Sequence, residues 1–189
     1  MQFENDITYC LKVLQEGGLI LYPTDTVWGI GCDATNDEAV AKIYALKKRQ
    51  ESKSMIVLVG EDQDISKYTQ QPSIKVYDYI KGLHKPVTVI YQNAFNLSKN
   101  IINEDGSIGI RVVNEKFCKT LLQEFGKPIV ATSANLSGFP TPLLFSDIDL
   151  LIKEGVDYIV QYRQEETAPA KPSAIIKIND DGSYTTIRT

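Results

Sequence analysis

Short apolar runs that suit β-strands alternate along the chain with segments whose apolar residues recur at helical spacing. The expected strands cover residues 19–22, 55–59, 87–91, 107–113, 129–131, 158–160, 174–178 and 184–188, and residues 27–32 are expected to form an extended segment broken by glycines. The expected helices cover residues 6–15 and 72–81, and run from Thr35 or Asn36 to Arg49, from Asn114 to Gly126, and from Ser146 to Gly155. The last two strands flank residues 179–182, a typical hairpin turn. This order predicts an α/β fold: a single domain over residues 1–189, with one twisted mixed sheet and flanking helices.

Charge and apolar patterning exclude several classes of protein. Acidic residues outnumber basic ones, 24 against 20, which gives a net charge of −4 and a pI near 5.1. A general nucleic-acid coat protein should instead be basic. The longest uninterrupted apolar run has five residues, 55–59, far fewer than the roughly 20 that a membrane-spanning helix needs. With an acidic N-terminus that lacks the apolar core of a signal peptide, the chain is expected to be cytoplasmic and to make no membrane contact.

Histidine and cysteine are too few and too scattered for the commonest catalytic and metal-binding motifs. His84 is the only histidine, so a Ser-His or Cys-His nucleophile pair would have to use it. Cys10, Cys32 and Cys118 lie far apart in the sequence, and we expect reduced, mostly buried thiols. No metal site built from protein side chains is predicted, because these residues offer no ligand spacing.

Hydroxyl side chains follow the first expected strand. Residues 22–29 read Tyr-Pro-Thr-Asp-Thr-Val-Trp-Gly, which places Thr24 and Thr26 on a turn where open α/β sheets usually bind their ligands. The alternative is a turn whose hydroxyls only satisfy its own backbone.

A cationic stretch ends the second expected helix. Residues 47–53 read Lys-Lys-Arg-Gln-Glu-Ser-Lys, with four positive side chains and one negative, a local charge of +3. A solvated helix end is one interpretation, since cations are favoured at a helix C-terminus. The other is a polyphosphate clamp, because Lys53 lies beyond the helix and directly before a buried strand.

Short polar side chains also follow a strand late in the chain. Residues 129–138 read Ile-Val-Ala-Thr-Ser-Ala-Asn-Leu-Ser-Gly, and Thr141 comes soon after. Serine and asparagine there can bind phosphate or sugar oxygens, and Gly138 permits close approach of the backbone. The chain has neither a G-x-x-x-x-G-K-[ST] loop nor a G-x-G-x-x-G motif, so a nucleotide would bind through another architecture.

Taken together, the motifs resemble the YrdC family, the threonylcarbamoyl-AMP synthases. Those at 22–29, Lys47 and Arg49, 108–111, 132–138 and 171–173 fall in the order of that family and cover nearly the whole chain. The resemblance implies the short, single-domain form, with a twisted fold around a positively lined cavity. It implies a nucleotidyltransferase that converts ATP, L-threonine and bicarbonate into threonylcarbamoyl-AMP and pyrophosphate. That product feeds the threonylcarbamoyladenosine modification of tRNA.

Site residues follow from the resemblance position by position. The matches to threonine contacts are Thr26, Arg111, Ala131 and Ser173. The matches to ATP contacts are Arg49, Lys53, Ser107, Ser133, Thr141 and Arg188, with Lys47 and Asn135 as supporting members. Mg²⁺ is expected as a cofactor held chiefly by the ATP phosphates. No residue is assigned as a catalytic acid, base or nucleophile.

Other readings of the sequence stay open at this point. The fold could serve as a module that binds tRNA or structured RNA without chemistry, although the acidic pI counts against it. It could belong to a paralogue that has lost the synthase activity, or to an enzyme that adenylates another small amino acid. tRNA and the tRNA threonylcarbamoyl-transferase complex are open as partners.

Overall fold

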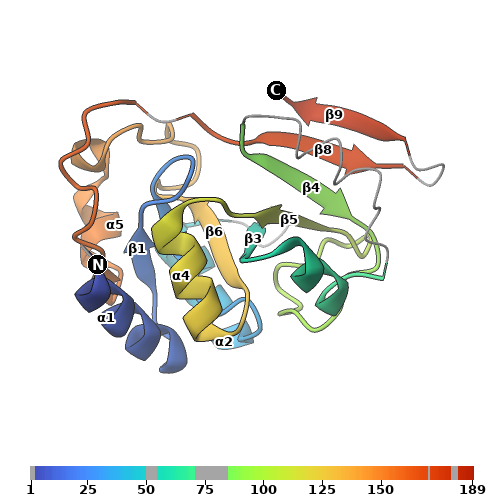
Figure 1. The fold of residues 1–189 in the computed structure, drawn as a ribbon. Coiled ribbons are helices and arrows are strands. Elements are labelled where there is room, and N and C mark those ends of the chain that lie inside the picture. Colours follow the sequence, from blue (N-terminus) through green and yellow to red (C-terminus); the bar gives the residue numbers. More distant parts are fainter. Residues whose placement is uncertain (1–2, 50–54, 71–84, 170, 180–182) are drawn as a thin grey trace.

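One mixed sheet organises the molecule. The computed structural model describes residues 3–49, 55–70, 85–169, 171–179 and 183–189. The strands are β1 (Ile20–Tyr22), β2 (Gly29–Gly31), β3 (Ile56–Val59), β4 (Val87–Tyr91), β5 (Ile108–Val112), β6 (Ile129–Ser133), β7 (Tyr158–Ile159), β8 (Ala174–Ile178) and β9 (Tyr184–Arg188). Among the described residues they form a nine-stranded sheet with the order β7-β1-β2-β6-β3-β5-β4-β8-β9 (Figure 1). The expected α/β fold class is confirmed.

Parallel and antiparallel pairs occur in the same sheet, as expected. The pairs β1–β7, β3–β5 and β4–β8 are parallel, and the other neighbours are antiparallel. At one edge β8 and β9 pair with Ile178 opposite Tyr184, which confirms the predicted hairpin. Residues 180–182 of its turn lie outside the described residues.

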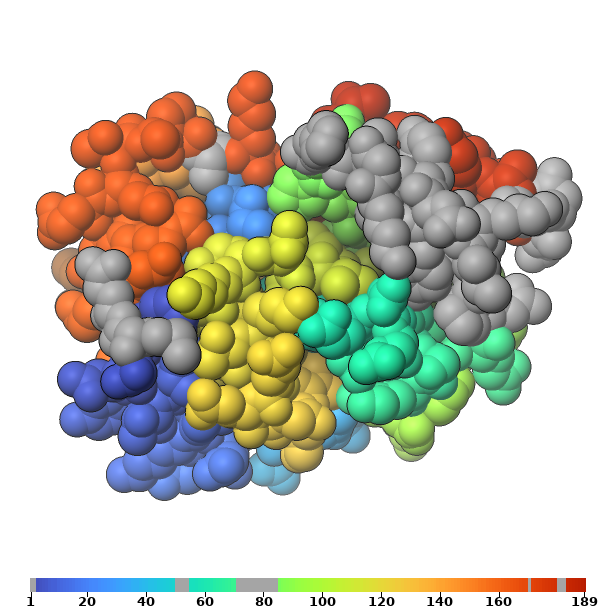
Figure 2. Space-filling view, in the orientation of Figure 1, coloured from blue at the N-terminus to red at the C-terminus, as the bar shows by residue number. Residues whose placement is uncertain are grey.

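Helices cover the two faces of the sheet. They are α1 (Glu4–Gln15), α2 (Asp37–Lys47), α4 (Lys116–Phe125) and α5 (Leu150–Glu154), with 3-10 turns η1 (Asp62–Lys67) and η2 (Phe145–Asp147). In the view of Figure 1, α1 and α4 lie in front of the sheet and α2 lies behind it. The rings of Phe3 and Phe117 meet edge to face at 5.5 Å, and Figure 2 shows α1 (blue) and α4 (yellow) side by side on the front surface.

Helix caps confirm some predicted boundaries and correct others. Asn36 caps α2, with its side chain accepting the N–H of Ala39 at 3.0 Å. The caps predicted at Asn114 and Ser146 are wrong. The carboxylates of Glu115 and Asp149 cap α4 and α5 instead, each accepting a first-turn N–H at 2.8 Å. A carboxylate at either position also interacts favourably with the positively polarised N-terminus of the helix.

Burial agrees with the apolar pattern. The three cysteines are free, buried thiols, as predicted, and burial raises the pKa of each. The expected helix at 72–81 lies outside the described residues. In the part of the chain that the structure describes, no helix is long and apolar enough to cross a membrane.

A glycine ends α4 in the left-handed region, which gives a test of the fold. Gly126 has φ = +70°, and an added Cβ would meet nothing within 4 Å. We expect Gly126→Ala to lower the free energy of unfolding by about 1 kcal/mol, because only the backbone strain of a left-handed alanine is introduced. Chemical denaturation measures the change. Gly60→Ala is the matched control, since its φ is ordinary and its new Cβ would make van der Waals contacts at 3.7–3.8 Å.

Candidate active site

Most of the residues assigned from the sequence gather around one cleft of about 270 Å³. Its walls come from the turn after β1, the chain after α2, the strands β5 and β6, and the edge hairpin β8–β9. The assigned residues that line it are Thr26, Arg49, Arg111, Ala131, Ser133, Thr141, Ser173 and Arg188. They are far apart in the sequence, and the sheet order brings them together.

The turn after β1 holds the guanidinium of Arg111. Within the turn, Thr24 Oγ1 accepts the N–H of Thr26 at 3.0 Å and donates to the carbonyl of Val27 at 2.9 Å. The turn therefore satisfies its own backbone, as one of the two interpretations predicted. It does more than that, because Arg111 Nη1 donates to Thr26 Oγ1 at 3.0 Å and Nη2 lies 3.4 Å from Thr24 Oγ1. The interpretation that the turn satisfies only its own backbone is therefore incomplete, and the ligand-binding interpretation stays a prediction.

Asp25 balances the charge of Arg111, a role that the sequence reasoning did not assign. Its Oδ1 lies 3.1 Å from Arg111 Nη2, but the hydrogen-bond geometry is poor, so the contact is an ion pair. Arg111 is only 3% exposed, and its Nε has no hydrogen-bond partner among the described residues. In the sequence, the one available signal was the position of Asp25 between Thr24 and Thr26.

The edge hairpin supplies a second hydroxyl and a second guanidinium. Ser173 Oγ lies 2.9 Å from Thr88 Oγ1 of β4, and both residues are buried. Arg188 Nε donates to the carbonyl of Ser173 at 2.9 Å, and its Nη2 lies 3.4 Å from Ser173 Oγ. The parallel pairing of β4 with β8 and the antiparallel pairing of β8 with β9 therefore place these groups beside Arg111.

Positive charge is concentrated in the cleft. Burial lowers the pKa of Arg188, and the positive charge of Arg111 lowers it further. Burial also lowers the pKa of Arg49. Both arginines nevertheless remain protonated at neutral pH. The described lining of the cleft contains no aspartate or glutamate that would neutralise them. Such a cleft favours an anionic ligand that can form charge-assisted hydrogen bonds.

Lys47 does not line this cleft but bonds to Ser133, which does. It is 1% exposed, and its ammonium donates to the carbonyl of Ser133 and, at 2.5 Å, to that of Asn135. The N–H of Ser137 donates back to the carbonyl of Lys47 at 2.8 Å. The solvated-helix-end interpretation is thus wrong for Lys47, although Lys48 is exposed. These bonds tie the end of α2 to the loop after β6, and so hold Arg49 and Ser133 in a fixed relation.

The burial of Lys47 predicts a pH dependence of stability. Desolvation, with the positive charge of Arg49 second, lowers the pKa of Lys47 to about 7. An unfolded lysine keeps a pKa of about 10.4, so between these values the unfolded state binds more protons and stability rises with pH. We expect the unfolding free energy of the wild type to rise with pH, relative to that of Lys47→Met, by up to about 1.4 kcal/mol per pH unit across this window. Denaturant titrations at pH 7, 8 and 9 measure it, and a difference independent of pH would contradict it.

Besides Lys47, two assigned residues that the structure describes, Asn135 and Ser107, do not line the cleft. Asn135 donates its amide to the carbonyls of Leu136 and Phe139, at 3.0 and 2.7 Å, and so braces its own loop. Ser107 lies just before β5 and accepts the amide of Asn103 at 2.9 Å. Side chains in a strand alternate between the two faces of the sheet, so Ser107 lies on the same face as Arg111, four positions later. Lys53 lies outside the described residues.

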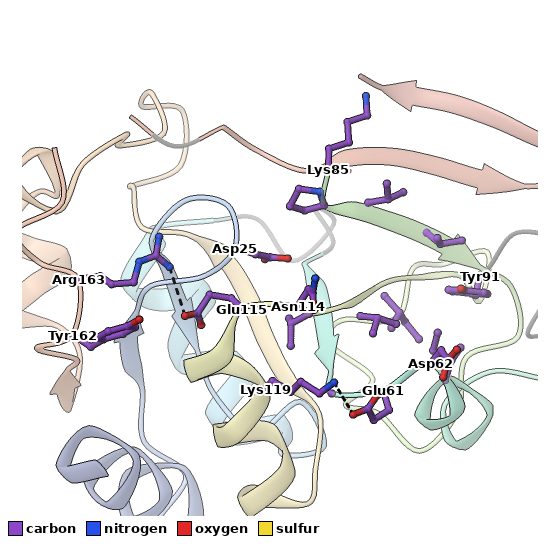
Figure 3. Close-up of a pocket in the computed structure, with 18 residues that line it drawn as sticks. Asp25, Glu61, Asp62, Lys85, Tyr91, Asn114, Glu115, Lys119, Tyr162 and Arg163 are labelled. Atoms are coloured by element: carbon purple, nitrogen blue, oxygen red, sulfur yellow. Dashed lines mark ion pairs between the residues drawn. The ribbon is translucent and has the colours of Figure 1, made fainter. Parts of the chain in front are cut away.

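A larger cavity of about 1040 Å³ faces the other side of the sheet (Figure 3). Ile110 and Val112 line it, whereas Arg111 between them lines the cleft. Its polar wall holds the ion pairs Lys119–Glu61 at 2.8 Å and Arg163–Glu115 at 3.9 Å. Asp25 points toward this cavity, but none of the residues assigned from the sequence lines it, so its size does not make it the better candidate.

Comparisons with known proteins agree with the sequence motifs. Residues 12–189 match the Sua5/YciO/YrdC family, which carries the description "telomere recombination". A relative from Pseudoalteromonas translucida, named threonylcarbamoyl-AMP synthase, is 34% identical over 85% of this chain and 87% of its own length. A relative of the same name from Saccharophagus degradans is 34% identical over 70% of each chain.

Solved structures share the fold. P. abyssi Sua5, crystallised in complex with L-threonine, superposes with a TM-score of 0.85 at 20% identity, over 98% of this chain and 54% of its own. This chain thus spans about half the length of that protein. E. coli YciO superposes with a TM-score of 0.82 at 21% identity, over 97% of this chain and 88% of its own. The chain belongs to the Sua5/YciO/YrdC family.

Proposed function

We propose that this protein is a threonylcarbamoyl-AMP synthase, a nucleotidyltransferase that uses ATP, L-threonine and bicarbonate. The relatives of that name match most of the chain at 34% identity. The observation that carries the proposal is the cleft itself, where Arg49, Arg111 and Arg188 surround buried hydroxyls. A triphosphate and an amino-acid carboxylate are the anions that such a site suits.

Threonine is assigned to the inner part of the cleft. The guanidinium of Arg111 is held by Thr26 and balanced by Asp25, which leaves it oriented for a carboxylate. Ser173 and Thr26 supply hydroxyls to the same cleft, and Ala131 also lines it. The ATP phosphates then belong near Arg49, Ser133 and Arg188, with Lys53 as a further cation.

The chemistry needs alignment more than covalent help from the protein. The amine nitrogen of threonine bonds to the carbon of bicarbonate, and water leaves. A carboxyl oxygen of the resulting carbamate attacks the α-phosphorus of ATP, the bond to the bridging oxygen breaks, and pyrophosphate departs. Preorganised cations stabilise the charge that develops on the phosphates, as in other phosphoryl and nucleotidyl transfers.

Mg²⁺ is proposed to arrive with the nucleotide. The described lining of the cleft offers hydroxyls and cations but no carboxylate, and the described residues contain no group of three side chains suited to hold a metal ion. Mg²⁺ commonly binds mainly through substrate phosphates, and it would neutralise charge on them here. The product would serve tRNA modification in the cytoplasm, with tRNA and the transferase complex as the partners that the resemblance suggests.

Pyrophosphate release tests the proposal directly. The full chain is incubated with Mg²⁺ and ATP, and threonine or bicarbonate is omitted in turn. We expect release only when all three substrates are present, with threonylcarbamoyl-AMP as the adenylated product. Release that does not depend on threonine or on bicarbonate would refute the proposed function.

A further inference from the structure

Thr88 carries a buried hydroxyl beside the cleft that the proposed function does not use. It lies in β4 opposite Ile175 of β8, and because Ile175 lines the cleft, Thr88 faces the same side of the sheet. Thr88 is only 1% exposed and does not itself line the cleft. Its Oγ1 lies 2.9 Å from Oγ of Ser173, which does line the cleft. Thr88 can therefore act on a ligand only through Ser173.

The packing of its methyl group holds the Thr88 side chain in place. A Cβ at Gly109 of β5 would lie only 3.3 Å from Thr88 Cγ2, so the missing side chain at Gly109 makes room for this methyl group. Both substituents sit on one Cβ, and the torsion about Cα–Cβ is stiff in a branched residue. A seated methyl group therefore also fixes the direction of the hydroxyl oxygen toward Ser173.

The surroundings of the two hydroxyls decide which of them donates. Among the described residues, Ser173 is the only hydrogen-bond partner of the Thr88 hydroxyl. If Ser173 donated to Thr88, the proton of Thr88 would be buried without an acceptor, which is costly. If Thr88 donates to Ser173, the proton of Ser173 is free to turn into the cleft. The second arrangement leaves no buried donor unpaired, so Thr88 is the donor.

The same count leaves Ser173 with a single role. A serine hydroxyl has two lone pairs and one proton. Arg188 Nη2 donates to Ser173 Oγ at 3.4 Å, and Thr88 donates to it at 2.9 Å. Both lone pairs are then used, so Ser173 can only donate to a ligand. The ligand atom opposite Ser173 is therefore an acceptor.

We propose that Thr88 is a positioning residue, which fixes Ser173 as a hydrogen-bond donor to the carboxylate of the amino-acid substrate. The inference rests on the proposed function for the identity of that substrate. An ammonium group only donates hydrogen bonds, so it cannot pair with a donating Ser173. Arg111 and Arg188 line the same cleft, and two guanidinium groups favour an anionic oxygen over a neutral one as the acceptor.

Calorimetry on the full chain tests the proposal, with L-threonine and L-threoninol as the probes. L-Threoninol has an alcohol in place of the carboxylate. Thr88→Val keeps the methyl group beside Gly109 and removes the hydroxyl, and it is expected to raise the Kd for L-threonine about 10-fold, because Ser173 is no longer held as a donor to a charged group. The Kd for L-threoninol is expected to change less than about 3-fold, since an alcohol both donates and accepts. Thr88→Ser retains the hydroxyl and should bind L-threonine within about 3-fold of wild type.

Two comparisons separate positioning from a general structural role. Thr69→Val is the matched control, because Thr69 is also 1% exposed and its hydroxyl donates to the carbonyl of Gln92 at 3.3 Å, but it does not line the cleft. Its Kd for L-threonine should equal that of wild type. In a Ser173→Ala background, Thr88→Val is expected to weaken L-threonine binding by less than about 2-fold further, because residues that act through one contact are not additive.

The outcomes separate this inference from the proposed function. An unchanged Kd for L-threonine in Thr88→Val, an equal loss for L-threoninol, no recovery in Thr88→Ser, or additive losses in the double variant would overturn the role of Thr88. These measurements need no turnover. A chain that shows the expected binding but releases no pyrophosphate would refute the synthase alone. A wild-type chain that does not bind L-threonine would refute both.

Discussion

Arg111→Lys is expected to lower kcat/KM for threonine by at least about 100-fold while the protein stays folded. Arg111 is buried in β5 and contacts Thr26, Thr24 and Asp25 at once. A lysine keeps the positive charge opposite Asp25, but its ammonium cannot hold Thr26 and a substrate carboxylate in one plane. Loss of two charge-assisted hydrogen bonds, at about 1.5–3 kcal/mol each, exceeds the roughly 2.7 kcal/mol that a 100-fold effect requires.

Initial rates of pyrophosphate release at varied threonine, together with a calorimetric Kd for ATP, measure this effect. The Kd for ATP is expected to change less than about 3-fold, because Arg111 is assigned to threonine. Arg163→Lys is the matched control: Arg163 donates to the carbonyl of Thr24 at 2.9 Å but does not line the cleft. Wild-type kcat/KM in Arg111→Lys, or an equal loss in Arg163→Lys, would contradict the assignment of the carboxylate to Arg111.

Arg49→Ala is expected to reduce synthesis at least about 10-fold, with little change in the melting temperature without ATP. Arg49 lines the cleft just beyond α2, so its guanidinium is placed to contact the phosphates. A charge-assisted contact in a partly desolvated site is worth at least the roughly 1.4 kcal/mol that a 10-fold effect requires. Arg49→Lys should recover only part of the rate, because an ammonium cannot reproduce a planar two-point contact.

Lys48→Ala is the control for Arg49. Lys48 is exposed and forms the left-handed C-cap of α2, with φ = 49°, and it does not line the cleft. Alanine also carries a Cβ there, so the backbone strain is nearly unchanged, and removal of a surface charge should alter stability by less than about 0.5 kcal/mol. Full activity in Arg49→Ala, or an equal loss in Lys48→Ala, would leave the phosphate role of Arg49 without support.

Local chemistry made much of the fold readable from the sequence. Apolar periodicity located the strands because burial follows a period of two in strands and a longer period in helices. β4 has the predicted bounds of 87–91, and Gly126 ends its helix as expected. The caps predicted at Asn114 and Ser146 are wrong because several polar side chains near each helix start can cap it, and residue type alone does not decide which one does; Glu115 and Asp149 take that role.

The sequence by itself determined which residue types were available and, through ordered motifs, which family they belong to. It could not decide between a solvated and a buried role for Lys47, since helical periodicity does not show what a long side chain reaches. It also did not assign Asp25, whose role depends on a strand 86 positions later in the chain. Only the tertiary structure decided these points, because the order β6-β3-β5-β4-β8-β9 alone brings the arginines of β5 and β9 to one cleft. Contacts between distant segments arise from sheet pairing, and no local pattern encodes them.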